Sequence, residues 1–259
     1  MLYLLSPAKS LDYTSPVPAA VARQATEPQF SARAAELIAV LRRKTPAEVA
    51  SLMALSDTLA ALNVGRYAAW QPQATPANSK PAVLAFDGDV YGGLDAKTLK
   101  TADLRWAQQH LVLLSGLYGV LRPLDRLQPY RLEMGTALAT PHGKDLYAYW
   151  GDTVAEHLNA LQADAARPVV VNLASNEYAR VALRPALRAR VIDCVFEDWK
   201  GDRYKIISFF AKRARGLMAR YVVQHRITTP KKLLGFDADG YAHVPEVSTP
   251  DRLVFRRRV

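Results

Sequence analysis

Four short apolar runs of the chain each end in small, polar and tyrosyl residues. The runs are Leu2–Leu5, Ala82–Phe86, Leu111–Leu114 and Val169–Leu173. The carboxyl ends of parallel strands meet at one edge of an open α/β sheet, where ligands collect. If the four runs are parallel strands, the residues that follow or end them share one crevice. The candidates are Lys9, Asp89, Tyr91, Ser115, Tyr118, Asn172 and Glu177.

Such a crevice would hold groups that transfer protons and bind bases. Asp89 or Glu177 would serve as general acid or base, and Tyr118 or Tyr91 would stack on a base or donate a hydrogen bond. This pattern favours an enzyme that acts on a nucleotide or on a base flipped out of DNA. The alternative is that glycine and serine at strand ends only form turns and helix caps. Both interpretations stay open.

The segment from Ser208 to Arg226 has the pattern of a basic amphipathic helix, with Ser208 as its N-cap. At 100° per residue, one face is expected to point to the core; it carries Phe210, Ala214, Leu217 and Tyr221. The opposite face and its flank carry Lys212, Arg213, Arg215, Arg220 and Arg226. Gly216 on the polar side would let a ligand approach the backbone closely.

No acidic residue occurs between Arg203 and Lys232. A purely solvated helix face usually mixes charges of both signs, so the pattern favours phosphate binding over that alternative. Supporting contacts are expected from Lys9, Lys205, Arg122 and Arg131. The last two lie in the stretch 122–135, where Pro123 and Pro129 hold the chain extended and so position its arginines.

The charge of the protein is concentrated near its end. The chain has 259 residues and a net charge of +10. Residues 200–259 hold 14 basic and 5 acidic side chains, whereas residues 1–199 hold 20 and 19. This asymmetry is typical of an electrostatic site for a polyanion, and double-stranded DNA is the expected partner.

Several other classes of function have no support in the sequence. The five histidines show no metal-ligand spacing, no Walker or dinucleotide motif is present, and no cofactor is expected. No apolar run is long enough to span a membrane, and the single cysteine, Cys194, rules out an internal disulfide. We expect a cytoplasmic protein with no membrane partner. The presence of a small-molecule or nucleotide ligand is left open.

The elements that must position these residues follow from hydrophobic patterning. Uniformly apolar runs favour a sheet covered on both faces. Further strands are expected at Val191–Phe196, Tyr204–Phe209 and Leu253–Arg258, with a hairpin turn over Phe236–Tyr241. Helices are expected from Thr45, from Asp57 to Trp70, and from Lys144 to Leu161. The fold class is α/β: one domain over residues 1–259, with a mixed sheet flanked by helices.

Several phrases of the chain together resemble the bacterial YaaA family of peroxide stress proteins. They are Leu5–Asp12, Phe86–Tyr91, Leu114–Asp125, Pro129–Gly135, Gly143–Tyr147, Val171–Ser175 and Ile206–Gly216. The resemblance covers essentially the whole chain. It implies a cytoplasmic protein that limits damage to DNA by hydrogen peroxide and iron, and that binds duplex DNA in a basic cleft with a helix-hairpin-helix-like element. The corresponding place is Thr45 to Trp70, whose break at Met53–Ser56 has no glycine. The resemblance supplies no catalytic residues.

The leading hypothesis is a DNA-binding stress protein that holds phosphates with Lys212, Arg213, Arg215 and Arg220. The second is the nucleotide or flipped-base enzyme described above. A third is a scaffold for a protein partner.

Overall fold

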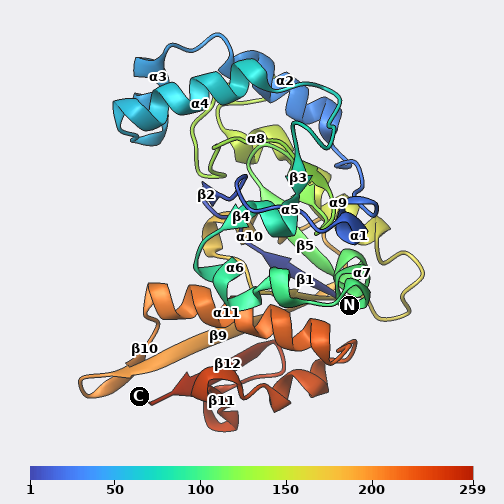
Figure 1. The fold of residues 1–259 in the computed structure, drawn as a ribbon. Helices are drawn as coiled ribbons and strands as arrows, with labels where there is room; N and C mark the ends of the chain where they lie inside the picture. Colours follow the sequence, from blue (N-terminus) through green and yellow to red (C-terminus); the bar gives the residue numbers. More distant parts are fainter. Residues whose placement is uncertain (259) are drawn as a thin grey trace.

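One mixed sheet of eight strands organises the computed structural model, which describes residues 1–258. Its order is β11-β12-β9-β8-β1-β5-β6, and β10 pairs with β9. Strands β12, β9, β8, β1 and β5 run parallel, and β6, β10 and β11 pair antiparallel with their neighbours. Helices flank the sheet (Figure 1). The expected α/β class with a mixed sheet is confirmed.

The strands of the main sheet differ widely in length. They are β1 (Leu2–Leu5), β5 (Leu111–Ser115), β6 (Gly119–Leu121), β8 (Val169–Asn172), β9 (Arg190–Lys200), β10 (Arg203–Lys205), β11 (Ala242–His243) and β12 (Arg252–Arg257). Two short antiparallel pairs lie outside it: β2 (Ser10–Leu11) with β4 (Phe86–Asp87), and β3 (Lys80–Pro81) with β7 (Arg126–Leu127).

Eleven helices lie between the strands of residues 1–258. They are α1 (Ala19–Ala22), α2 (Ser31–Leu41), α3 (Pro46–Met53), α4 (Asp57–Ala69), α5 (Ala82–Ala85), α6 (Asp89–Leu94), α7 (Thr101–His110), α8 (Leu146–Trp150), α9 (Thr153–Ala160), α10 (Asn176–Ala182) and α11 (Ser208–Gln224). Four short 3₁₀ segments complete the described chain: Ala96–Thr98, Pro230–Gly235, Ala238–Gly240 and Pro245–Val247.

The core forms around the central strands. Every residue of β1, β5 and β8 is buried. Strands that are apolar throughout need cover on both faces, because either face would otherwise expose apolar side chains to water. The apolar side chains of these three strands all belong to one continuous apolar cluster.

Helices α3 and α4 begin where the sequence predicts. Thr45 and Glu48 form a reciprocal capping box, and the Ser56 side chain accepts a hydrogen bond from the Leu59 N–H. The two helices are bent by 111° across a break at which Ala54 adopts a left-handed conformation. No single helix within residues 1–258 has the length and apolar composition to cross a bilayer; only α3 and α4 taken together across that bend do so.

The apolar run Ala82–Phe86 is not a strand of the main sheet, so that prediction is wrong. Ala82–Ala85 forms the short helix α5, and Phe86 begins β4, which pairs with β2. The N–H groups of Ala82 and Val83 donate to the carbonyls of Asp125 and Pro123. Short buried apolar runs have no periodicity that separates helix from strand.

Three other boundaries differ from the expectation. The helix over 144–161 is interrupted at Gly151, whose φ of 48° and ψ of −129° end α8 before α9 begins. The strand expected over 204–209 stops at Lys205, and Ser208 is the first residue of α11 and not its cap. The segment 236–241 is a 3₁₀ turn that leads into β11, and the link between β11 and β12 comes later.

Helix α11 is rotated relative to the predicted orientation. Phe210 is 38% exposed, and Leu217 and Tyr221 are only partly buried. The buried face carries no aromatic residue and consists mostly of small side chains: Ala211, Ala214, Met218, Ala219 and Val222. Of the four residues predicted for this face, Ala214 alone is buried. Hydrophobicity alone assigned the large side chains to the core. The actual orientation depends on how closely the neighbouring helix approaches.

That neighbour is α6, which crosses α11 with backbone almost against backbone. A Cβ atom added to Gly216 would lie 1.8 Å from the Val90 carbonyl oxygen. A Cβ added to Gly93 would lie 2.2 Å from the Arg213 carbonyl oxygen. Gly216 therefore admits α6 itself, and not the external ligand that its polar setting suggested.

The crossing predicts that substitution by alanine changes stability very differently at Gly216, which lies in the crossing, and at Gly92, which lies beside Gly93 but outside it. Gly216→Ala should lower the free energy of unfolding by about 3 kcal/mol, because the new methyl group meets fixed backbone atoms. Gly92→Ala is the matched control: nothing lies within 4 Å of its added Cβ. It should leave stability unchanged or raise it by up to about 1 kcal/mol. Urea unfolding of both variants measures this, and equal midpoints would refute the close crossing.

A candidate ligand pocket at the strand ends

The connections of the sheet diverge between β1 and β8. After β1, the next strand of the main sheet along the chain is β5, which lies beside β1. After β8, the next strand is β9, which lies beside β8 on the opposite side of the β8–β1 pair. Loops that leave two neighbouring parallel strands in opposite directions open a crevice at the carboxyl ends. Ser6 follows β1 and Ser175 lies just after β8. The Ser175 N–H donates to Ser6 Oγ at 2.9 Å, and the two hydroxyl oxygens are 3.3 Å apart.

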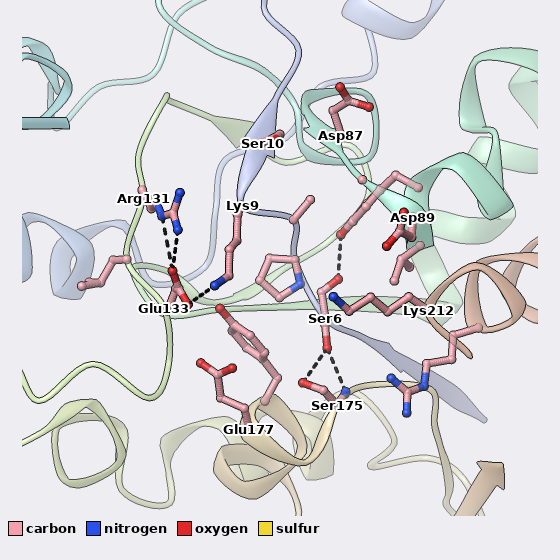
Figure 2. A pocket seen from close by; sticks show the side chains of 18 of the residues that line it. Ser6, Lys9, Ser10, Asp87, Asp89, Arg131, Glu133, Ser175, Glu177 and Lys212 are labelled. Atoms are coloured by element: carbon pink, nitrogen blue, oxygen red, sulfur yellow. Dashed lines mark hydrogen bonds and ion pairs between the residues drawn. The ribbon is translucent and has the colours of Figure 1, made fainter. Parts of the chain in front are cut away.

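A cavity of about 300 Å³ lies at this point (Figure 2). Its polar lining comes from the loop after β1, the start of α6, the segment 130–133, the start of α10 and the first turns of α11. These residues are Ser6, Lys9, Ser10, Asp87, Asp89, Tyr91, Tyr130, Arg131, Glu133, Ser175, Glu177, Tyr178, Lys212 and Arg215. Segments far apart in the sequence thus supply one site.

Glu133 joins two cations on one side of the pocket. One carboxylate oxygen lies 2.7 Å from Lys9 Nζ, and the other accepts from Arg131 Nη2 at 3.0 Å. Figure 2 shows Glu133 between the two basic side chains. One carboxylate therefore pairs with two cations, and the three groups together keep a net charge of +1. The Lys9 side chain remains 63% exposed, so it is accessible to a competing anion.

Two other carboxylates face the cavity from different helices. Glu177 in α10 accepts a hydrogen bond from the Gly135 N–H at 2.9 Å, and Tyr147 OH donates to the Glu177 carbonyl at 2.9 Å. Asp89 lies in the first turn of α6. In Figure 2 the Asp89 carboxylate lies near the Lys212 side chain, which extends toward Ser6. Acidic and basic groups thus alternate around the cavity.

Lys212 and Arg215 reach the pocket from α11. Neither forms an ion pair with a carboxylate among residues 1–258, and Arg215 Nε is buried without a hydrogen-bond partner there. Burial lowers the pKa of Arg215, although an arginine guanidinium keeps its proton in proteins. These are the cations of the pocket whose charge no carboxylate of the described chain balances through an ion pair.

Three tyrosines form the walls. Tyr91 OH donates to the Ser6 carbonyl at 3.1 Å, and Tyr130 OH lies 2.6 Å from Ser115 Oγ. Burial raises the pKa of Tyr91, Tyr130 and Tyr178 far above that of free tyrosine. Their hydroxyl groups therefore stay protonated and supply neutral walls around the charged groups.

The structure brings together about half of the predicted site residues. Those that line the pocket are Lys9, Asp89, Tyr91, Arg131, Glu177, Lys212 and Arg215. Ser115, Tyr118 and Asn172 do not line it. Tyr118 OH accepts from Trp70 Nε1 at 2.9 Å, and Asn172 Nδ2 donates to Asp193 at 2.8 Å. Burial raises the pKa of Tyr118 to about 12. These three side chains form hydrogen bonds with other residues of the protein and do not line the pocket.

The other predicted phosphate contacts are distributed differently. Arg122 donates to the Gln108 carbonyl and lies outside the pocket. Lys205 is in β10, opposite Asp198 of β9. Arg220 donates to the carbonyls of Leu94 and Asp95 at 3.0 and 2.9 Å, which fixes the end of α6.

Three arginines predicted to face outward lie near carboxylates of other segments: Arg213 and Arg220 within α11, and Arg226 just after its end. Arg226 pairs with Asp103 at 2.7 Å, and Arg213 lies 3.8 Å from Asp239. The expected unopposed row of outward guanidinium groups is therefore partly neutralised. A single-sequence count of charges misses this, because Asp103 is more than a hundred residues away from its partner.

Several polar pocket residues were not predicted as site residues: Ser6, Ser10, Asp87, Tyr130, Glu133, Ser175 and Tyr178. Ser6 and Ser175 could have been found from their positions directly after β1 and β8. Glu133 carries no such signal, because its role depends on the approach of Lys9. Within residues 1–258, no group of three or more His, Cys, Asp or Glu side chains is arranged to hold a metal ion.

The amino-acid sequence matches one family of known proteins along almost its whole length. The sequence model described as "Peroxide stress protein YaaA" matches residues 1–247. A UPF0246 protein of Leptothrix cholodnii is 69% identical over 257 residues, covering 99% of this chain and 98% of its own. UPF0246 proteins of Paracidovorax citrulli and Variovorax paradoxus are 62% and 61% identical, each covering 100% of this chain and 99% of its own.

Proposed function

The chain belongs to the YaaA family of peroxide stress proteins, and we propose that it acts in that response by binding duplex DNA through a basic face and so limiting iron-dependent damage. The basic face consists of the β9–β10 hairpin, the first turns of α11 and the adjoining rim of the pocket. Its residues are Lys200, Arg203, Lys205, Lys212, Arg213, Lys9 and Arg131.

The observation that carries the proposal is that four cations of the hairpin and the start of α11 form no ion pair within residues 1–258. Lys200 and Arg203 are exposed, and Lys205 and Lys212 follow within a few residues. None of these four forms an ion pair within the described part of the chain. Surface cations without an ion pair bind phosphate at little cost in free energy, because no existing pair must be broken. On binding they also release counterions from DNA.

The geometry restricts which residues would contact DNA. Arg220 and Arg226 are occupied by α6 and Asp103, so we assign them no phosphate. The α3–α4 pair lies at the other end of the molecule from α11 (Figure 1). Its break, Ala54-Leu55-Ser56, has no bare glycine backbone to approach a phosphate. We therefore centre binding on the hairpin and α11.

Coverage of phosphates offers a physical route to protection. DNA holds a condensed layer of cations, and a protein that neutralises phosphates displaces them. Ferrous iron held in that layer reacts with peroxide next to the bases. Displacing it moves the oxidising reaction away from the DNA. Because such binding reads the backbone, it should depend weakly on base sequence.

Salt dependence tests this proposal. Affinity for duplex DNA should fall steeply with added salt, and the double variant Arg203→Ala/Lys205→Ala should make the slope of log K against log salt shallower by about 2. Fluorescence anisotropy at several salt concentrations measures the slope.

The matched control is Lys231→Ala/Lys232→Ala, which removes the same charge beyond the opposite end of α11. That helix has 17 residues and is about 25 Å long. The control should change affinity much less than the hairpin variant. Equal losses in both, or an affinity of the unmodified protein that ignores salt, would contradict a defined basic face.

A second candidate function is catalysis on a nucleotide or a flipped base, favoured by the presence of Asp89 and Glu177 in one pocket. In cells that lack the native protein and express a variant instead, Asp89→Ala and Glu177→Ala should then abolish protection against hydrogen peroxide. Their affinity for duplex DNA should stay intact. Asp164→Ala, an exposed carboxylate outside the pocket, is the control. Full protection by all three variants would argue against chemistry at this site.

A further inference from the structure

The pocket contains charged groups that binding to a duplex surface leaves unused. Arg215 is partly buried, with an unpartnered Nε, and a phosphate that stays on a duplex surface would contact the exposed hairpin instead. A volume of about 300 Å³ is at the small end of ligand pockets, which range over about 300–1,000 Å³. The cavity is therefore sized for one small molecule or one nucleotide.

Two cations of the pocket form no ion pair within residues 1–258. Lys212 and Arg215 bring two cations from one face of α11, and the linked Ser6 and Ser175 hydroxyls lie at the switch point nearby. In Figure 2 Lys212 extends toward Ser6, so these donors converge. The Ser6 hydroxyl donates to the Ser175 hydroxyl, which leaves the hydrogen of Ser175 free. Two cations with this one hydroxyl group form a donor set that suits the oxygens of a phosphate group.

The carboxylates supply the opposite chemistry. Asp89 and Glu177 face the same cavity and can only accept hydrogen bonds when ionised. Glu177 uses one oxygen for the Gly135 N–H. A simple anion such as free phosphate would be repelled by these groups. A ligand that carries both a phosphate and N–H or O–H donors would satisfy both sets.

We propose that this pocket binds one nucleoside monophosphate unit. Lys212, Arg215 and the Ser175 hydroxyl hold its phosphate, and Asp89 and Glu177 accept hydrogen bonds from its base or sugar. The unit comes either from solution or from a nucleotide turned out of a DNA strand. The second source rests on the proposed DNA binding, and the first does not.

Calorimetric titration with deoxynucleoside monophosphates, the matching nucleosides and inorganic phosphate tests the pocket directly. Each monophosphate should bind at least tenfold more tightly than its nucleoside or than phosphate alone. Arg215→Gln should weaken monophosphate binding at least tenfold. Lys212→Gln, at an exposed position where folding is not at risk, should weaken it severalfold. Lys231→Gln, an exposed cation beyond the far end of the same helix and outside the pocket, should stay within twofold.

A duplex that carries 2-aminopurine separates the two sources. Turning the base out of the stack should raise its fluorescence with the unmodified protein and not with Arg215→Gln. Monophosphate binding without the fluorescence rise assigns the pocket to a free nucleotide, and the rise without free binding assigns it to DNA. Neither signal, or equal binding of nucleoside and monophosphate, overturns the pocket assignment. The salt slope of the hairpin variant is independent of Arg215, so duplex binding can stand when the pocket assignment fails.

Discussion

The close crossing of α6 and α11 is the constraint on which the site depends. Gly93 and Gly216 let the two backbones approach so closely that an added Cβ at either position would overlap a carbonyl oxygen of the other helix. Arg220 then donates to the carbonyls at the end of α6 and fixes the crossing along its length. This packing sets the rotation of α11. With that rotation, Lys212 and Arg215 reach the strand ends and Phe210 is left at the surface.

The sheet supplies the other half of the site. Because the connections after β1 and β8 diverge, Ser6 and Ser175 meet at the switch point. The α6 helix brings Asp89, and α10 brings Glu177. Cations from α11 and carboxylates from the two other helices therefore line one small cavity together. The outer cations of the hairpin lie beyond it and form an extended surface for a polyanion.

Much of this arrangement could be predicted from the sequence. The fully apolar runs correctly indicated β1, β5 and β8, and the residues after β1 and β8 correctly indicated Lys9 and Glu177 as neighbours. Asp89 lines the same pocket, although the run before it forms α5 and β4 and not the strand that the prediction required. The rotation of α11 could not be predicted, because it depends on two glycines that are 123 residues apart meeting in space. The neutralisation of Arg226 by Asp103 was hidden for the same reason. Local patterns fix the elements, and long-range contacts decide which charges remain free.

The central claim is that cations beside the pocket meet a polyanion, and Glu133 gives the most direct test because it holds Lys9 and Arg131 in competition with phosphate. The measurement is the affinity of Glu133→Gln for duplex DNA at fixed salt, with Glu246→Gln, an exposed carboxylate outside the pocket, as a control of equal charge. Freeing both cations should tighten binding about tenfold, against less than twofold for the control. A gain of affinity cannot arise from unfolding. Unchanged or weaker binding by a stably folded Glu133→Gln protein would contradict the account.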